Sequence, residues 1–236
     1  MIKIGNVSLE KPALVLTVTD SESPSAIQKA KRLGAQILEL RIDRFKFRSE
    51  EELIRKIRAL KKLRIPLIAT LRSRKEGGAR SIPEARRIQL FKKVLPWTDA
   101  IDLELSSKRL LKLIPHARRR GNRVILSYHN FHSTPPDRTL EGLLRKARRQ
   151  GADLVKIAVT PQKKEDVGRL LLFTSQHREK SLVSIAMGRF GKPSRILAPL
   201  FGSRLGYTFI GRSQAPGQIP IRQFGPEWKA FFPARK

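Results

Sequence analysis

The chain has 236 residues, of which 40% are hydrophobic, and this is enough to bury one large core. It contains no cysteine, so disulfide bonds, thiolate catalysis and cysteine-ligated zinc are excluded. Residues 1–8 lack the apolar stretch of a signal peptide, and no apolar run approaches the roughly 20 residues that cross a bilayer. We therefore expect a soluble cytoplasmic protein with no membrane partner.

The formal net charge of +30 is unusual, because 50 Lys and Arg residues stand against 20 Asp and Glu residues. Such an excess often indicates a polyanionic partner. The basic clusters at 61–64, 116–120 and 145–149 fall in segments with helical patterns, without interleaved aromatic residues or zinc-finger spacing. We interpret the charge as a basic, solvated exterior that binds polyanions non-specifically, in preference to a dedicated nucleic-acid site.

Short apolar runs alternate with longer amphipathic or charged segments from end to end. The runs predict strands that start roughly 23 to 33 residues apart, the length of one strand, one helix and their loops. The expected strands are 13–18, 36–41, 66–72, 100–105, 122–128, 153–158, 181–187 and 207–211.

The segments between these strands carry helix signals. Ser23 and Pro24 predict an N-cap and a first-turn proline, and Ser49 with Glu52 resembles a capping box. A glycine at the end of a helix often adopts the left-handed conformation that stops it. Glycines stand between an expected helix and the next strand at Gly34, Gly121 and Gly151.

Eight strand–helix units in about 230 residues predict an α/β fold, a parallel (β/α)₈ TIM barrel. No glycine-rich dinucleotide motif follows the first strand, which disfavours an open doubly wound sheet. We expect residues 2–9 to form a short N-terminal β-hairpin that closes the barrel floor. Residues 1–223 are expected to form a single catalytic domain, and residues 224–236, which are apolar with little periodicity, a C-terminal tail.

Ionisable and polar side chains gather at one end of five adjacent expected strands. In such barrels the active site lies at the C-terminal ends of the strands, and residues two apart on a strand share a face. We therefore expect an enclosed polar pocket rather than isolated structural ion pairs. Its expected members on the strands are Glu39, Arg41, Thr70, Arg72, Asp102, Glu104, His129 and Lys156.

Lys156 is the most informative of these residues, because it interrupts an otherwise apolar strand. Burial disfavours the charged form, and no carboxylate lies beside it on the same strand, so we expect a lowered pKa. A neutral lysine is an amine nucleophile that can form a Schiff base with a carbonyl substrate. The alternative is a strand-edge lysine whose charged end reaches solvent.

His129 follows the fifth expected strand and can move protons near pH 7. A histidine that only holds the backbone is the alternative role, and the neighbouring His132 is a competing candidate. His116 and His177 fall in helical stretches, where we expect them to be exposed.

Three loops at the same end add further candidates. The loop after the third strand contains a carboxylate and two glycines, and the loop after the seventh strand carries an arginine suited to an anion. The loop after the eighth strand has the composition of a mobile lid. These loops contribute Glu76, Arg195, Gln214 and Gln218.

Together these segments closely resemble type I 3-dehydroquinate dehydratases, Schiff-base enzymes of the shikimate pathway with a (β/α)₈ barrel. The resemblance spans nearly the whole chain in the right order, and its specificity lies in the combination of segments. The matching segments are 39–43, 70–73 with 76–78, 127–131, 155–158, 184–188 with 194–195, and 215–218.

The resemblance implies a hydro-lyase that converts 3-dehydroquinate into 3-dehydroshikimate, acts as a homodimer and uses no metal or organic cofactor. Lys156 would condense with the C3 ketone, and His129 would remove the C2 proton and then assist departure of the C1 hydroxyl. Glu76 would orient His129, and Arg195 would pair with the substrate carboxylate. The implied contacts with the substrate oxygens and the lid are Glu39, Arg41, Arg72 and Gln218.

One position departs from the family pattern. The family often has serine immediately before Ala-Pro-Gly-Gln, where this chain has Gln214, with Ser213 one residue earlier. Gln214 can still donate and accept hydrogen bonds, so we expect it to bind substrate and the departure to affect the lid rather than the activity.

Two alternatives stay open. Another Schiff-base barrel lyase or aldolase would use the same lysine chemistry on a different substrate. A basic nucleic-acid-binding protein on a non-catalytic barrel would show steeply salt-dependent binding and no turnover.

Overall fold

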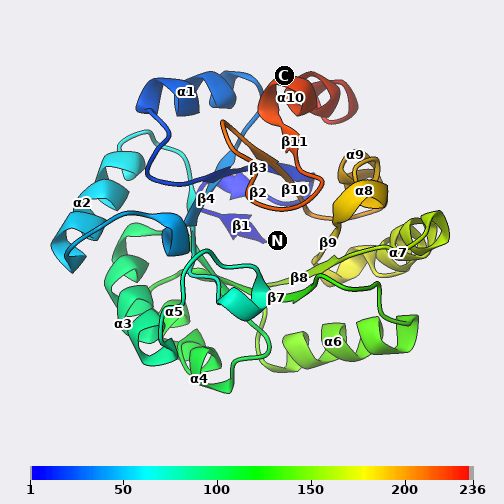
Figure 1. Ribbon diagram of the computed structural model, residues 1–236, viewed down its shortest axis with the longest axis horizontal. Coiled ribbons are helices and arrows are strands. Elements are labelled where there is room, and N and C mark those ends of the chain that lie inside the picture. Colours follow the sequence, from blue (N-terminus) through cyan, green and yellow to red (C-terminus); the bar gives the residue numbers. More distant parts are fainter. Residues whose placement is uncertain (1, 234–236) are drawn as a thin grey trace.

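The centre of the molecule is a parallel sheet that curls into a barrel (Figure 1). The computed structural model describes residues 2–233, apart from the side chain of Lys180. The strands follow the order β11-β10-β3-β4-β5-β6-β7-β8-β9. At the seam between β9 and β10, the Arg204 amide donates to the Leu182 carbonyl at 2.9 Å. The strands are β3 (Ala13–Val18), β4 (Ile37–Arg41), β5 (Leu67–Thr70), β6 (Ala100–Glu104), β7 (Arg123–Asn130), β8 (Leu154–Val159), β9 (Leu182–Ala186), β10 (Leu205–Phe209) and β11 (Ile219–Pro220).

Helices surround the barrel, as the (β/α)₈ prediction requires (Figure 1). The α-helices are α1 (Pro24–Arg32), α2 (Glu50–Lys61), α3 (Glu84–Val94), α4 (Lys108–Leu111), α5 (Ile114–Arg119), α6 (Asp137–Arg149), α7 (Lys164–Gln176), α8 (Gly188–Gly191), α9 (Ser194–Leu200) and α10 (Ile221–Phe231). The short 3₁₀ turns are η1 (Ile42–Arg44), η2 (Arg74–Glu76), η3 (Leu95–Trp97) and η4 (Arg178–Lys180).

The predicted helix ends are confirmed. Ser23 Oγ accepts from the Ala26 amide at 3.2 Å, and Ser49 Oγ accepts from the Glu52 amide at 3.2 Å, so each caps the first turn of its helix. Positive φ angles of 113°, 79° and 93° occur at Gly34, Gly121 and Gly151.

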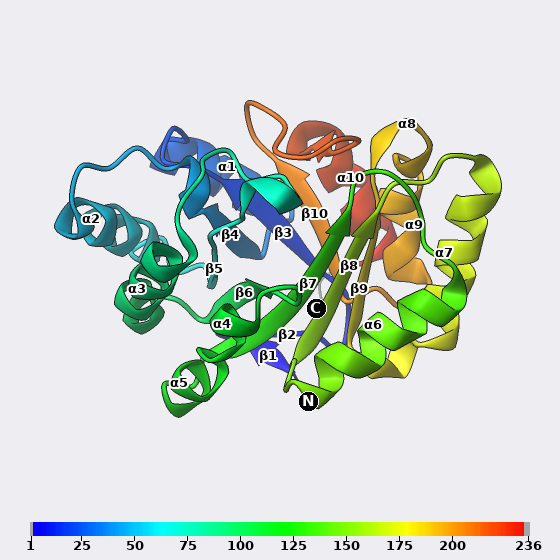
Figure 2. The ribbon, with the colours of Figure 1, turned by 60° about the horizontal axis from the view of Figure 1, so that its bottom comes forward.

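The predicted hairpin closes the floor of the barrel. Strands β1 (Lys3–Ile4) and β2 (Val7–Ser8) pair antiparallel and lie at the end of the barrel where the strands begin (Figure 2). Ile4 and Leu9 are buried against the apolar side chains at the bottom of the barrel interior. Because the floor is filled, a ligand can enter the barrel only from the end where the strands finish.

Towards their N-terminal ends the strands are largely apolar on both faces, because both faces are covered. Along β4, for example, Ile37 points into the barrel, whereas Leu38 and Leu40 belong to the core beneath the helices. Within residues 2–233, none of the helices is both long and apolar enough to span a membrane.

The structure differs from the sequence predictions at the C-terminal end. Strand β10 starts at Leu205, two residues earlier than expected, β11 joins the sheet without having been expected, and α10 spans residue 223. Trp228 of that helix is 3% exposed and packs against β10, where a Cβ atom on Gly206 would lie 2.4 Å from its ring. The expectation that His177 is exposed is also wrong, since its Nδ1 lies 2.8 Å from the Phe173 carbonyl in the core.

Candidate active site

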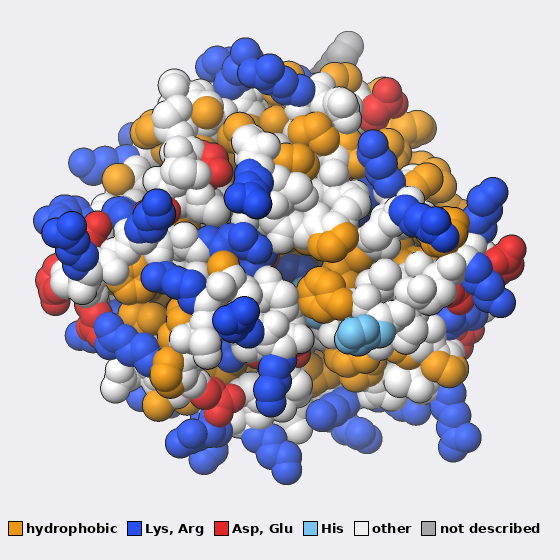
Figure 3. Space-filling model, in the orientation of Figure 1, with side chains coloured by type: hydrophobic (Ala, Val, Ile, Leu, Met, Phe, Trp, Pro, Cys, Tyr) orange, Lys and Arg blue, Asp and Glu red, His pale blue; other side chains and the backbone are white. Residues whose placement is uncertain are grey.

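A cavity of about 200 Å³ opens at the ends of the barrel strands. Figure 3 shows this face hollowed at its centre, with basic side-chain atoms in the hollow. All nine residues predicted to be catalytic or substrate-binding line the cavity, so the fold brings together side chains that are far apart in the sequence. They are Glu39, Arg41, Arg72, Glu76, His129, Lys156, Arg195, Gln214 and Gln218.

Lys156 lies on β8 inside the barrel and is 5% exposed. Its Nζ donates to Glu39 Oε1 at 3.1 Å and to Asp102 Oδ2 at 3.2 Å, and lies 4.4 Å from the centre of the Tyr207 ring. Burial lowers the pKa of Lys156, but the Glu39 and Asp102 carboxylates more than offset this and raise it. The expected lowered pKa is therefore wrong, and the resting side chain is an ammonium.

His129 and Glu76 form a pair, with His129 Nδ1 2.9 Å from Glu76 Oε2. Burial and the Arg72 and Lys156 cations lower the pKa of His129 well below its usual value, so the imidazole is neutral. Burial raises the pKa of Glu76 to about 7, although Arg72 opposes this. The competing candidate His132 is exposed and does not line the cavity.

The turn that carries Glu76 is closely packed rather than merely flexible. Gly77 has a φ of 85°, and a Cβ atom there would lie 2.5 Å from the Phe131 ring. A Cβ atom on Gly78 would lie 2.0 Å from the Arg72 carbonyl oxygen. Both glycines are required to bring the carboxylate against His129.

Buried carboxylates orient Arg41, at the end of β4, and Arg72, which follows β5. Arg41 makes a two-point contact with Asp43, with Nε–Oδ1 at 2.9 Å and Nη2–Oδ2 at 2.8 Å. Arg72 lies 2.8 Å from Asp102 through Nη2 and donates to Ser127 Oγ at 2.7 Å through Nη1. Although burial raises the pKa of each aspartate, the neighbouring arginine lowers it overall, so both carry charge.

Asp102 was expected in the polar pocket, because it is a charged residue within an apolar strand at the same end as Lys156, but no role was assigned to it. Asp43 and Ser127 were not among the predicted site residues. Among the described residues, no group of three His, Cys, Asp or Glu side chains is arranged to hold a metal ion.

Arg195 lies at the start of α9 and is 6% exposed. Its Nη2 donates to the Pro216 carbonyl at 2.8 Å, whereas its buried Nε has no hydrogen-bond partner among the described residues. Burial lowers the pKa of Arg195 to about 10, which still leaves it charged at neutral pH. A buried guanidinium with an unused donor beside a cavity is suited to a carboxylate.

The predicted lid lies over the cavity and is held by its own side chains. Gln218 Oε1 accepts from the Gln214 amide at 2.7 Å and from the Ala215 amide at 3.1 Å. Gln214 Nε2 donates to the Arg212 carbonyl at 2.8 Å, while its buried Oε1 has no partner within residues 2–233.

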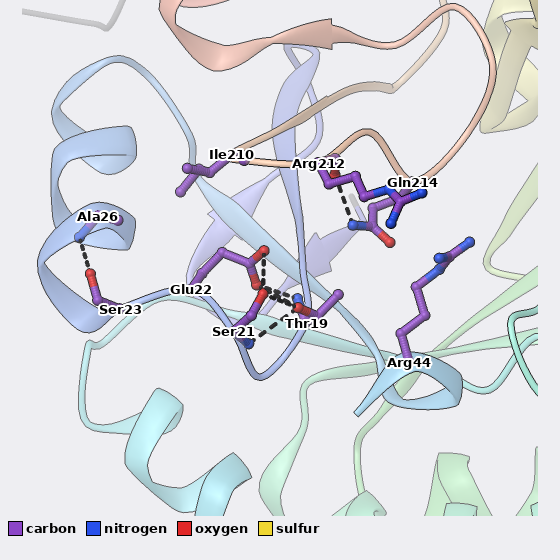
Figure 4. Close-up of a pocket in the computed structure, with 10 residues that line it drawn as sticks. Thr19, Ser21, Glu22, Ser23, Ala26, Arg44, Ile210, Arg212 and Gln214 are labelled. Carbon is purple, nitrogen blue, oxygen red and sulfur yellow. Dashed lines mark hydrogen bonds between the residues drawn. The ribbon is translucent and has the colours of Figure 1, made fainter. Parts of the chain in front are cut away.

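A second pocket, of about 460 Å³, adjoins the mouth of the cavity. Arg44 and Gln214 line both spaces, and Figure 4 shows them on the same side of the second pocket as Arg212. Burial and the Arg41 charge lower the pKa of Arg44. Arg44 and Arg212 place cationic side chains along the approach to the cavity.

Comparisons with known proteins agree with this geometry. A sequence model of the family described as type I 3-dehydroquinase matches residues 13–225. The chain belongs to this family. The curated 3-dehydroquinate dehydratase of Methanosarcina barkeri is 39% identical, over 94% of this chain and 96% of its own length.

Solved structures of the family have the same fold. The 3-dehydroquinate dehydratase of Aquifex aeolicus VF5 has a TM-score of 0.83 and 36% identity, and the match covers 94% of this chain and 100% of that one. The type I enzyme of Clostridium difficile, solved with covalently modified comenic acid, has a TM-score of 0.86 and 27% identity, over 98% and 96% of the two chains.

The activity is therefore that of a 3-dehydroquinate dehydratase, a hydro-lyase of the shikimate pathway that converts 3-dehydroquinate into 3-dehydroshikimate. Type I members of the family work through a Schiff base, and the site described above contains one buried lysine suited to that chemistry.

Proposed function

We propose that Lys156 forms the Schiff base with the C3 ketone of 3-dehydroquinate. The observation that carries this assignment is a buried ammonium, 3.1 Å from Glu39 and 3.2 Å from Asp102, beside a small cavity that also contains His129. Even a paired ammonium loses its hydration in a barrel interior, and a buried ionisable group with a shifted pKa beside a cavity is typical of a functional site.

The charged resting state fits the stoichiometry of this step. An ammonium and a ketone give an iminium and one water molecule with no proton from outside. The nitrogen keeps one proton, and the other two leave with the ketone oxygen. Before it attacks, the nitrogen must pass a proton to an acceptor, and the nearest are the Glu39 and Asp102 carboxylates.

His129 then removes the C2 proton, which the iminium acidifies by withdrawing electrons from the neighbouring carbon. The protonated imidazole returns this proton to the C1 hydroxyl, which departs as water. The lowered pKa of His129 supports the base role, because a neutral imidazole has a free electron pair. Glu76 holds Nδ1 and leaves Nε2 for the substrate.

Arg195 binds the substrate carboxylate in this proposal, supported by its unused, buried Nε beside the cavity. The remaining contacts with the substrate hydroxyl groups and the closed lid are assigned to Glu39, Arg41, Arg72, Gln214 and Gln218.

Borohydride trapping tests the assignment, because the reagent reduces an imine to a stable amine. The protein treated with 3-dehydroquinate and borohydride should carry one adduct, which mass spectrometry after digestion assigns to the Lys156 peptide. Lys156→Met should abolish the adduct, and the exposed Lys146→Met on α6 should retain it. An adduct on another lysine would reject the assignment.

The same experiment distinguishes the two alternatives. A different Schiff-base lyase or aldolase would trap its own ketose on Lys156 and fail to turn over 3-dehydroquinate. A non-catalytic nucleic-acid-binding barrel would trap neither compound.

A homodimer in the cytoplasm completes the proposal. Leu172 on α7 and Leu200 on α9 are 61% and 48% exposed on two helices that pack against each other, and exposed leucines favour an interface. Light scattering should give a dimer mass that falls to the monomer mass in Leu172→Glu/Leu200→Glu.

We also propose residues 1–223 as the catalytic domain and 224–236 as a tail whose helical part packs on the barrel.

We also propose non-specific polyanion binding, which is supported by basic side chains in the last turns of α1, α2, α3, α5 and α6. In a (β/α)₈ barrel all helices run antiparallel to the strands, so their C-terminal ends surround the floor. Binding to immobilised heparin should weaken steeply with salt, and charge reversal at these positions should weaken it without changing turnover. Basic residues in the last turns are Lys29, Lys31, Arg32, Arg58, Lys61, Lys92, Lys93, Arg118, Arg119, Lys146, Arg148 and Arg149.

A further inference from the structure

Lys156 lies in a layer of four side chains that come from alternate strands of the barrel. Glu39 on β4 and Asp102 on β6 contact its Nζ, and Tyr207 on β10 presents its ring 4.4 Å from the same atom. Alternate strands of a (β/α)₈ barrel place their inward side chains at the same height. Three members of this layer already have a role in the Schiff-base step, and Tyr207 has none.

Tyr207 is 4% exposed and lines the same cavity as Lys156. Its hydroxyl is buried without a hydrogen-bond partner among residues 2–233. A buried hydroxyl that forms no hydrogen bond is unfavourable and calls for an explanation.

The other hydroxyl groups around this layer are already used. Thr70 Oγ1 donates to Glu39 at 3.1 Å, Thr17 Oγ1 donates to Glu39 at 3.5 Å, and Ser127 Oγ donates to Asp102 at 2.5 Å. Of these four hydroxyls, Tyr207 is the one whose proton is not committed to a carboxylate. Burial also raises its pKa, so the phenol keeps its proton at neutral pH.

We propose that the Tyr207 hydroxyl donates a hydrogen bond to the oxygen of the carbon that Lys156 attacks, and so accelerates imine formation. The inference rests on the Schiff-base function proposed above. When Nζ forms the C–N bond, the C=O π electrons move to the oxygen, which becomes a hydroxyl and later leaves as water. Both protons of that water come from the Lys156 ammonium, and Tyr207 stabilises the charge that develops on the oxygen without losing its proton.

Tyr207→Phe removes the hydroxyl and keeps the ring. In a single turnover quenched with borohydride, we expect the adduct on Lys156 to form about 10²- to 10³-fold more slowly, as for the loss of one donor to a developing oxyanion. The melting temperature should stay the same or rise, because an unpartnered buried hydroxyl is removed. A residue that only supported the fold would lower the melting temperature instead.

The chain supplies a matched control, because it has only two tyrosines. Tyr128 is partly buried on β7, where its hydroxyl accepts from Asn130 Nδ2 at 3.3 Å, and it does not line the cavity. Tyr128→Phe should trap the imine at the parent rate. If Tyr207→Phe also forms the adduct at the parent rate, the role of Tyr207 is overturned and the Schiff-base function stands. If the parent protein gives no adduct on Lys156, the proposed function itself fails.

Discussion

Two neighbouring layers inside the same barrel have equal burial and opposite chemistry. The lower layer is apolar and the upper layer is polar, although each upper residue follows a lower one by two positions on the same strand. All of these side chains are at most 5% exposed, so burial alone does not explain which positions are ionised. The pairs, lower residue first, are Ile37 and Glu39, Ala100 and Asp102, Leu154 and Lys156, and Leu205 and Tyr207.

The difference shows how a barrel separates stability from chemistry. The lower layer is sealed by the hairpin and fills space, whereas the upper layer faces the cavity and holds its charges by mutual contacts. A charge in the upper layer is tolerated only while its partners remain, because an unpaired buried ion is far less favourable than a paired one.

Replacing Lys156, the cation of the upper layer, should have the largest effect on both activity and stability. Lys156→Met should reduce turnover of 3-dehydroquinate by about 10⁴-fold or more, because the covalent step is lost. It should also lower the free energy of unfolding by about 3–5 kcal/mol at neutral pH, since Glu39 and Asp102 lose their shared partner.

Two measurements check this prediction. Steady-state kinetics report the turnover, and denaturant unfolding at several pH values reports the charge effect. The loss of stability should shrink as the pH falls, because protonation of a carboxyl group relieves the unpaired charge. The matched change Leu154→Met in the lower layer should preserve activity, and parent-like turnover in Lys156→Met would refute the Schiff-base assignment.

His129→Ala should reduce the elimination by about 10²- to 10⁴-fold, the usual contribution of a general base, while imine formation stays measurable. The reason is that His129 contacts Glu76 rather than the carboxylates that hold Lys156. Rapid-quench kinetics separate adduct formation from product release. Parent-like elimination in this variant would shift the base role to another residue, and His132→Ala, which alters an exposed side chain, is the control.

A truncation in the lower layer should have the complementary outcome. Leu154→Ala removes a fully buried side chain between the hairpin and the upper layer, and should lower the free energy of unfolding by about 2–5 kcal/mol. Below its melting transition the variant should keep the parent kcat, because no group of the upper layer is removed. A large loss of kcat with intact folding would show that the two layers are not separable.

Arg195→Ala should raise KM by about 10- to 100-fold and change kcat much less, because a guanidinium–carboxylate contact is mainly a binding contact. Steady-state kinetics give both constants. Arg189→Ala, on the neighbouring α8 but outside the cavity lining, is a suitable control. An unchanged KM in Arg195→Ala would mean that Arg41 or Arg72 holds the carboxylate.

Most of the barrel could be predicted from the sequence, because buried parallel strands are apolar runs that stand out between amphipathic helices. The C-terminal end was harder, since Gly206 and Gly225 look like turn residues. In the structure they allow close packing, with a Cβ atom on Gly206 2.4 Å from the Trp228 ring and one on Gly225 2.4 Å from the Leu33 carbonyl oxygen. Sequence alone does not separate these two uses of glycine.

Nine of the side chains that line the cavity could be predicted from the sequence, but their electrostatics could not. The expectation for the pKa of Lys156 considered only its own strand, whereas Glu39 and Asp102 reach it from strands 117 and 54 residues away. Tyr207 shows the same limit, because its sequence neighbourhood does not reveal that its hydroxyl lies beside the lysine without a partner.

The smallest predicted effect concerns Glu76, whose pKa of about 7 sets which nitrogen of His129 carries the proton. Above this pH the carboxylate accepts from Nδ1–H, and Nε2 keeps the electron pair that a general base needs. Below it the carboxylic acid donates to Nδ1, the ring proton moves to Nε2, and the base is blocked. We therefore expect kcat/KM to fall as the pH drops below about 7.

Glu76→Gln removes this titration, because an amide can accept from Nδ1–H at every pH. The inflection near pH 7 should disappear, and at pH 8 the variant should lose less than about tenfold in kcat/KM, since only the charge that stabilises the imidazolium is missing. Glu141→Gln, which alters a carboxylate on α6 outside the cavity lining, should keep the parent profile. An inflection that persists in Glu76→Gln would assign it to another group of the upper layer, and the pairing of His129 with Glu76 would then not control the base.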